Sequence, residues 1–265
     1  KDWLVNNIVV GAGDTFKELL FRNKMIIHPE LAKAIIKKLK KADDSVSDDA
    51  VCEYLTLLDS YIFSGWDIFS MIEMLAKRGL FSNCRRLFER YFNMSFLLEK
   101  DVWSKDKAFK YKHAFEGSYY FIDTSWKLCQ EKFLTDIPSQ WMYLTKNTIC
   151  KLHESYQALE HTNDHVEPWC MYMLEIEDKD DSPEEDQLIL LCRIFCQACK
   201  AVEQSSPEFV TNFLEMCFHE PSALLKKVCL KALRELERPD SNEKFDIFIK
   251  NSLFEFWEGK EQVFL

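Results

Sequence analysis

The sequence predicts an all-α protein, and three observations support that prediction. Apolar residues recur at helical spacing along most of the 265 residues, in stretches bounded by helix-capping residues. The chain contains only 6 Gly and 7 Pro, which is too few for the turns of a sandwich, a barrel or a doubly wound sheet. The best apolar run of strand type, Ile8-Val9-Val10, is three residues long.

Six helices are expected in the first hundred residues. They span residues 3–10, 15–24, 29–41, 50–63, 66–77 and 82–98. The third is the clearest, because Leu31, Ile35 and Leu39 form one apolar stripe after a start at Pro29. The fifth is expected to end at Gly79, in the position after a helix that glycine favours. Between residues 100 and 117 the helical pattern is lost.

Six more helices are expected in the rest of the chain. They span residues 119–134, 139–159, 183–202, 207–218, 222–236 and 241–256. Two of them begin at Ser182-Pro183 and Ser206-Pro207, where serine suits the N-cap and proline the first helical position. The run 175–186 holds eight carboxylates and one lysine, which is typical of an exposed loop or a helix start.

About a dozen helices with short connections predict stacked antiparallel helical hairpins, an α-solenoid, and a compact bundle is the alternative. The segment Glu53-Tyr-Leu-Thr-Leu-Leu-Asp-Ser-Tyr-Ile-Phe-Ser-Gly65 resembles the first helix of a pentatricopeptide repeat. Met71, Met74 and Lys77-Arg78-Gly79 resemble the end of its second helix. The resemblance covers residues 50–80 without an equally good second copy, so it implies hairpins similar to tetratricopeptide repeats. In the pentatricopeptide family, the residue at the position of Thr56 helps to read an RNA base.

The charge is unevenly distributed along the chain. Residues 1–150 carry 22 Lys and Arg against 20 Asp and Glu, whereas residues 151–265 carry 12 against 24. We therefore expect a near-neutral helical region over 1–160 and an acidic one over 161–265, continuous with the first. The acidic region is a poor surface for nucleic acid, because phosphate binding needs clustered cations.

The ten cysteines predict a reducing compartment, either cytoplasmic or nuclear. Most of them lie in apolar, helical stretches, where cysteine behaves as a small hydrophobic residue. Cys192, Cys196 and Cys199 have a C-x₃-C-x₂-C spacing that resembles the cluster motif of radical S-adenosylmethionine enzymes. The stretch is an uninterrupted helical pattern, however, so we interpret the three as core residues.

Other candidate sites are weaker. His161 and His165 have a spacing that suits zinc, with Cys170 as the nearest third ligand, but they lie in a polar turn. Gly11-Ala12-Gly13 lacks the third glycine and the β-α-β unit of a dinucleotide loop. We expect no catalytic residue, no metal and no cofactor. No apolar run approaches the ~20 residues of a membrane span.

These observations predict a protein-interaction or scaffold domain of a larger intracellular protein, which binds a partner protein or peptide. The candidate partner-binding patch consists of cations and aromatic residues: Lys105, Lys107, Phe109, Lys110, Tyr111, Lys112 and Phe115. A packed aromatic face covered by lysines would have the same composition. The alternative is an RNA-binding helical-repeat domain that uses the more basic first half. An enzyme or a metal or cluster protein that uses Cys192, Cys196 and Cys199 is the third hypothesis.

Overall fold

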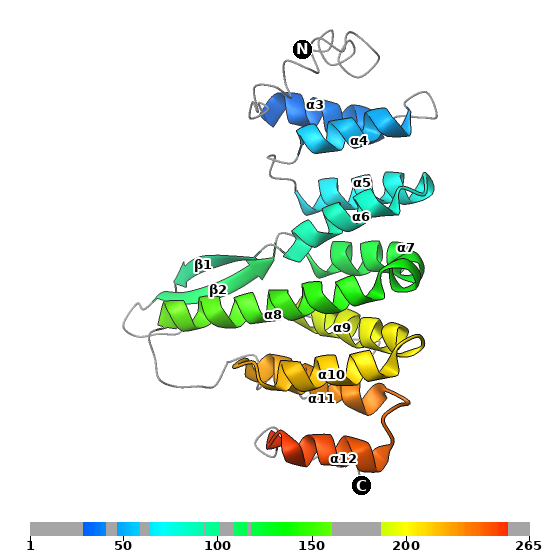
Figure 1. Cartoon of the computed structure of the whole chain (residues 1–265). Helices are drawn as coiled ribbons and strands as arrows, with labels where there is room; N and C mark the ends of the chain where they lie inside the picture. The colour runs from blue at the N-terminus through cyan, green and yellow to red at the C-terminus, as the bar shows by residue number, and fades with distance from the viewer. Residues whose placement is uncertain are drawn as a thin grey trace. The chain divides into compact units, whose positions relative to one another are not determined.

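The structure, a computed structural model, is built mainly of α-helices (Figure 1). It describes residues 29–40, 47–58, 64–92, 94–100, 109–115, 118–160 and 187–253. These ranges hold ten α-helices, one 3₁₀ turn and a two-stranded sheet. The predicted helical class is confirmed. The described residues hold ten helices rather than about a dozen, and the sheet was not predicted.

The elements follow the chain in a simple order. The first group consists of α3 (Pro29–Lys40), α4 (Asp48–Leu57), α5 (Gly65–Lys77), α6 (Phe81–Phe88), η1 (Glu89–Phe92), β1 (Met94–Lys100) and β2 (Phe109–Phe115). The second group consists of α7 (Tyr119–Asp136), α8 (Pro138–Glu160), α9 (Gln187–Glu203), α10 (Pro207–Phe218), α11 (Ala223–Glu235) and α12 (Ser241–Lys250).

The chain divides into two compact units, and the division passes through α7 after Cys129. Unit 1 comprises residues 1–93 and 115–129, and unit 2 comprises residues 94–114 and 130–265. These units follow packing rather than charge. The division at residue 160 was expected from charge composition; the two units do not test it, so it stays a prediction. The stacking of helical hairpins along the whole chain also stays a prediction.

The core of unit 1 lies between α5 and its neighbours α3 and α6. One side of α5 is fully buried, through Ile68, Met71, Ile72 and Leu75. Trp126 of α7 is also buried and meets the ring of Phe88 at 5.7 Å. Burying each of these large apolar side chains contributes about 1.5–3 kcal/mol to folding.

The core of unit 2 is centred on α9, which packs against α8, α10 and α11. Eleven residues of α9 are buried, so this helix is apolar on most of its circumference. Phe195 of α9 meets Phe213 of α10 at 6.2 Å. At the edge of this core, Lys146 of α8 forms an ion pair with Glu220, just after α10.

Several predicted helix boundaries are confirmed. α10 begins at Pro207 and ends at Phe218 as expected, and α3 begins at Pro29. Ser222 caps α11 by accepting a hydrogen bond from the Leu225 amide at 3.2 Å. Ser206 occupies the N-cap of α10, but its side chain makes no capping hydrogen bond. Among the described residues, Gly79 is the only glycine with a positive φ, 73°, where the chain leaves α5.

Two local predictions are wrong. The helix expected over 82–98 ends at Phe88, and residues 94–100 form a strand instead. A short apolar run fits a strand or a helix equally well, so periodicity could not decide between them. Gly65, the last residue of the segment that resembles the first helix of a pentatricopeptide repeat, is instead the first residue of α5. Ser64 accepts a hydrogen bond from the Asp67 amide, so the Ser-Gly pair begins a helix.

Candidate functional site

The first candidate surface begins at the N-terminus of α5, which is fixed in place by hydrogen bonds. The Ser64 hydroxyl donates to the Asp67 carboxylate at 2.7 Å and accepts from the Asp67 amide at 3.1 Å. Lys40 of α3 forms an ion pair with the same carboxylate at 2.9 Å. Burial raises the pKa of Asp67, but the hydrogen bonds from Lys40 and Ser64 outweigh burial, so the pKa lies below its usual value.

A buried tyrosine joins the start of α5 to α7. The Tyr91 hydroxyl donates to the Gly65 carbonyl at 3.4 Å and lies 3.2 Å from the Ser125 hydroxyl. Both Tyr91 and Ser125 are fully buried. Burial raises the pKa of Tyr91, so the phenol stays protonated and can act as the donor. Tyr91 therefore joins the first turn of α5 to the second turn of α7.

Four aromatic rings meet where the first turns of α5 and α7 come together. Trp66 and Phe69 belong to α5, and Tyr120 and Phe121 belong to α7. Phe121 is central: its ring lies 5.6 Å from Trp66, 5.8 Å from Phe69 and 5.6 Å from Tyr120. Trp66 is 57% exposed and Tyr120 is 65% exposed. We call these four residues the aromatic surface.

The aromatic surface has the composition of a protein-binding site. One exposed apolar side chain is ordinary, but adjoining ones mark interaction sites. Tryptophan and tyrosine are enriched among the residues that dominate binding energy. Phe121 packs against both exposed rings, which limits the side-chain entropy that they lose on binding.

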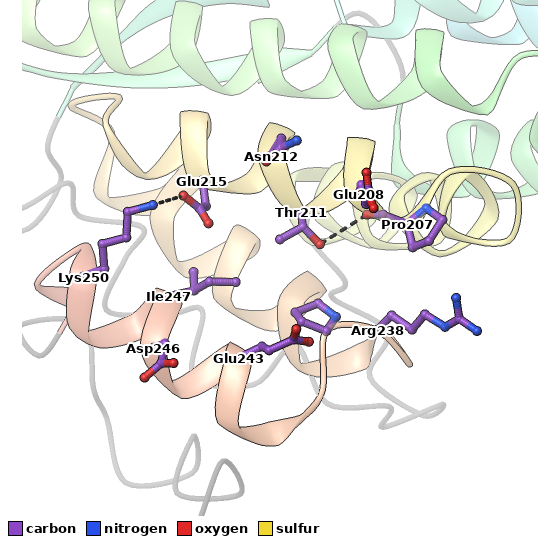
Figure 2. Close-up of a pocket in the computed structure, with 11 residues that line it drawn as sticks. Pro207, Glu208, Thr211, Asn212, Glu215, Arg238, Glu243, Asp246, Ile247 and Lys250 are labelled. Atoms are coloured by element: carbon purple, nitrogen blue, oxygen red, sulfur yellow. Dashed lines mark hydrogen bonds and ion pairs between the residues drawn. The ribbon is translucent and has the colours of Figure 1, made fainter.

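The second candidate surface is a groove in unit 2 between α10 and α12, with a volume of about 720 Å³ (Figure 2). Its lining consists of Pro207, Glu208, Thr211, Asn212, Glu215, Arg238, Pro239, Glu243, Asp246, Ile247 and Lys250, which we call the charged groove. Glu215 of α10 and Lys250 of α12 form an ion pair at 2.6 Å, so this contact joins the two helices. Ile247 is buried, which gives the groove an apolar element.

The turn between α11 and α12 is held by buried and capping groups. Glu203 of α9 is buried and accepts a hydrogen bond from the Arg238 amide at 2.6 Å. Lys244 donates to the carbonyl of Leu236 at 2.6 Å and to that of Arg234 at 3.3 Å. Burial lowers the pKa of Lys244, and nearby Glu203 partly offsets this shift.

The cysteines of the third hypothesis lie in the core. Cys192, Cys196 and Cys199 are all buried on α9, and burial raises the pKa of Cys196 to about 12. Metals bind thiolates, so this environment opposes ligation. Within the described part of the chain, no group of three or more His, Cys, Asp or Glu is arranged to hold a metal ion. The arrangement matches the interpretation of these residues as core.

The other described cysteines follow the same pattern. All nine described cysteines are thiols, and seven of them are buried, as the sequence predicted. Cys150 is half-buried, and burial raises its pKa to about 11. At neutral pH the Cys150 thiol is therefore protonated and a weak nucleophile.

The predicted partner-binding patch is only partly described. Phe109, Lys110, Tyr111, Lys112 and Phe115 belong to β2. Lys105 and Lys107 lie outside the described residues. The patch is therefore not tested and stays a prediction.

Several weaker candidates also lie outside the described residues. They are the glycines at 11–13, the pair His161 and His165, Cys170 and the acidic run 175–186. The helices expected over 3–10 and 15–24 fall in the same category.

Sequence reasoning missed both surfaces. Trp66 was placed at the start of a helix, and Tyr120 near the start of another, but nothing in the sequence showed that these starts meet. A partial signal was present, because Trp66 lies on the far side of the helix from the buried Ile68, and Phe69 follows three residues later at the border of the buried face. An aromatic pair that reaches the outer face of an amphipathic helix is unusual enough to be singled out.

Comparisons with protein-family models, with curated proteins and with solved structures find no match. None of the helices that the structure describes is both long enough and apolar enough to cross a membrane.

Proposed function

We propose that this chain is a protein-interaction domain that binds a partner polypeptide through the aromatic surface. The observation that carries the proposal is the exposure of Trp66 and Tyr120 around the packed ring of Phe121. A partner side chain placed against these rings would remove apolar area from water, at about 25 cal/mol for each Å². The predicted scaffold role in a larger intracellular protein is part of this proposal.

The nine described thiols support a reducing compartment, either cytoplasmic or nuclear, because disulfides are rare there.

The hairpins that resemble tetratricopeptide repeats are a further part of the proposal. Stacked helical hairpins offer extended surfaces for partner segments, which suits a scaffold.

The test is a comparison of three forms of the protein as bait in a lysate of the cells that produce it. The forms are the wild type, the double variant Trp66→Ala/Tyr120→Ala, and the control Phe209→Ala/Ile249→Ala. The control removes two exposed apolar side chains that lie outside the aromatic surface. Thermal melting of each variant checks that it is folded.

We expect at least one partner to bind the wild type and the control but not the aromatic variant. Truncating an interface tryptophan or tyrosine costs about 2 kcal/mol or more, which is about thirtyfold in affinity. Equal recovery with all three forms would contradict the proposal. If the aromatic variant only turns a wild-type dimer into a monomer, the partner is a second copy of the chain.

The RNA-binding alternative is distinguished by salt. Binding to phosphates weakens by orders of magnitude between about 50 and 200 mM salt, because counterions are released. Binding to the aromatic surface should change little over this range. A single-stranded RNA that binds with the steep salt dependence would favour the alternative.

A further inference from the structure

The charged groove is not isolated on the surface of unit 2. A second cavity of about 320 Å³ adjoins it, and Pro207 and Arg238 line both. Lys200 and Gln204, at the end of α9, extend the lining on that side. We call these two adjoining cavities the channel. They lie along α10 and α12 and reach the end of α9, which suits an extended segment of polypeptide.

The channel has an excess of negative charge that is not neutralised. Four carboxylates and two cations line the larger cavity. Glu215 is neutralised by Lys250, whereas Glu208 and Asp246 are exposed and form no ion pair within the part of the chain that the structure describes. Glu208 belongs to α10 and Asp246 to α12, so each wall of the groove offers one carboxylate to a cation.

The channel is also held in shape before any ligand arrives. Asp240 and Glu243 form a reciprocal capping box at the start of α12. The Asp240 carboxylate accepts from the Glu243 amide at 2.9 Å, and the Glu243 carboxylate accepts from the Asp240 amide at 2.9 Å. Glu203 fixes the neighbouring Arg238 amide. A wall that is already ordered loses little entropy when a ligand binds.

We propose that the charged groove binds a polypeptide segment that carries Lys or Arg side chains next to an apolar one. The cations would pair with Glu208 and with Asp246, and the apolar side chain would lie against Ile247 and Pro207. The excess of carboxylates disfavours nucleic acid and anionic lipid, because both present phosphate. The proposal rests on the proposed role in protein binding, but it uses a surface in unit 2 that is separate from the aromatic surface.

The test measures binding of a fluorescein-labelled peptide of repeating Lys-Ala-Lys-Leu units by fluorescence anisotropy. Three forms of the protein are compared at about 50 mM salt: the wild type, Glu208→Gln/Asp246→Asn, and the control Glu131→Gln/Glu154→Gln. The control removes two exposed carboxylates elsewhere in unit 2, so both double variants change the net charge equally. A peptide with Glu in place of Lys serves as the negative probe.

We expect the groove variant to bind the basic peptide about fivefold more weakly than the wild type, since two ion pairs are lost. The control should change by less than about twofold, and the Glu peptide should not bind. Absence of binding to the wild type, or an equal loss in both double variants, would overturn the proposal. The variant Trp66→Ala/Tyr120→Ala should bind this peptide like the wild type. A failure of the charged groove to bind the peptide can therefore be distinguished from a failure of the aromatic surface to bind a partner.

Discussion

Removal of the Tyr91 hydroxyl is the most informative change in unit 1. Tyr91→Phe keeps the buried ring but deletes the hydrogen bonds to the Gly65 carbonyl and to Ser125. One net hydrogen bond is worth about 1 kcal/mol, and a buried hydroxyl that loses its partner costs about 1–3 kcal/mol. Ser125 is fully buried. We therefore expect a loss of about 2 kcal/mol, which is about thirtyfold in the opening equilibrium of this unit.

The assay is native-state hydrogen exchange of peptides from α5 and α7, because a global melt would combine the two units. Tyr120→Phe is the matched control, since it deletes an exposed hydroxyl from α7, the helix that carries Ser125, and we expect a change within about 0.5 kcal/mol. The pair Tyr91→Phe/Ser125→Ala should cost less than the sum of its single variants, because both hydrogen-bonding partners are gone. Additive effects, or equal effects of Tyr91→Phe and Tyr120→Phe, would refute the reasoning.

Two further predictions follow from backbone and charge. At Gly79, φ is 73° and a Cβ would meet nothing within 4 Å. In a urea titration, Gly79→Ala should therefore lower the free energy of unfolding by about 1 kcal/mol through backbone strain alone. Gly65→Ala, at the start of α5, should be tolerated in the same titration. An equal loss at both glycines would contradict this explanation. The lowered pKa of Asp67 means that its contribution to stability is present above about pH 4 and is lost as the pH falls further. The urea midpoints of the wild type and of Asp67→Asn should therefore differ at about pH 7 and converge below about pH 4. A gap between the two midpoints that stays constant with pH would show that the stabilisation by Asp67 does not come from its ion pair with Lys40.

The sequence was most informative where local chemistry decides the structure. Pro207 cannot donate an amide hydrogen bond and fits the first position of a helix, so the start of α10 was predicted to the residue. Gly79 tolerates a positive φ, so the end of α5 was also predicted. These features depend on residues within one or two turns of each other, which a single sequence displays directly.

Prediction failed where distant parts of the chain decide the structure. The alternation of Phe109, Tyr111 and Phe115 with Lys110 and Lys112 has the period of two that indicates a strand, and β2 forms there. The signal was overlooked because the residues that pair with it, 94–100, resembled the continuation of a helix.

The candidate surfaces illustrate the same limit. The aromatic surface needs the Tyr91 bridge to join α5 to α7, and the charged groove needs α12 to lie against α10. Neither contact leaves a pattern in one sequence, because its partners are separated by tens of residues. The cysteines were predictable because burial on an amphipathic helix depends on spacing alone.

The most direct test of the central claim is photo-crosslinking from position 66 in living cells. Trp66 is replaced by a benzophenone-bearing aromatic amino acid, which keeps a large apolar group on the aromatic surface. Ser82, an exposed residue of α6 in the same unit, carries the same group in the control. Binding of a partner through the aromatic surface should give a covalent adduct with a polypeptide from position 66 that is absent from position 82. No adduct at position 66, or the same adduct from both positions, would contradict it.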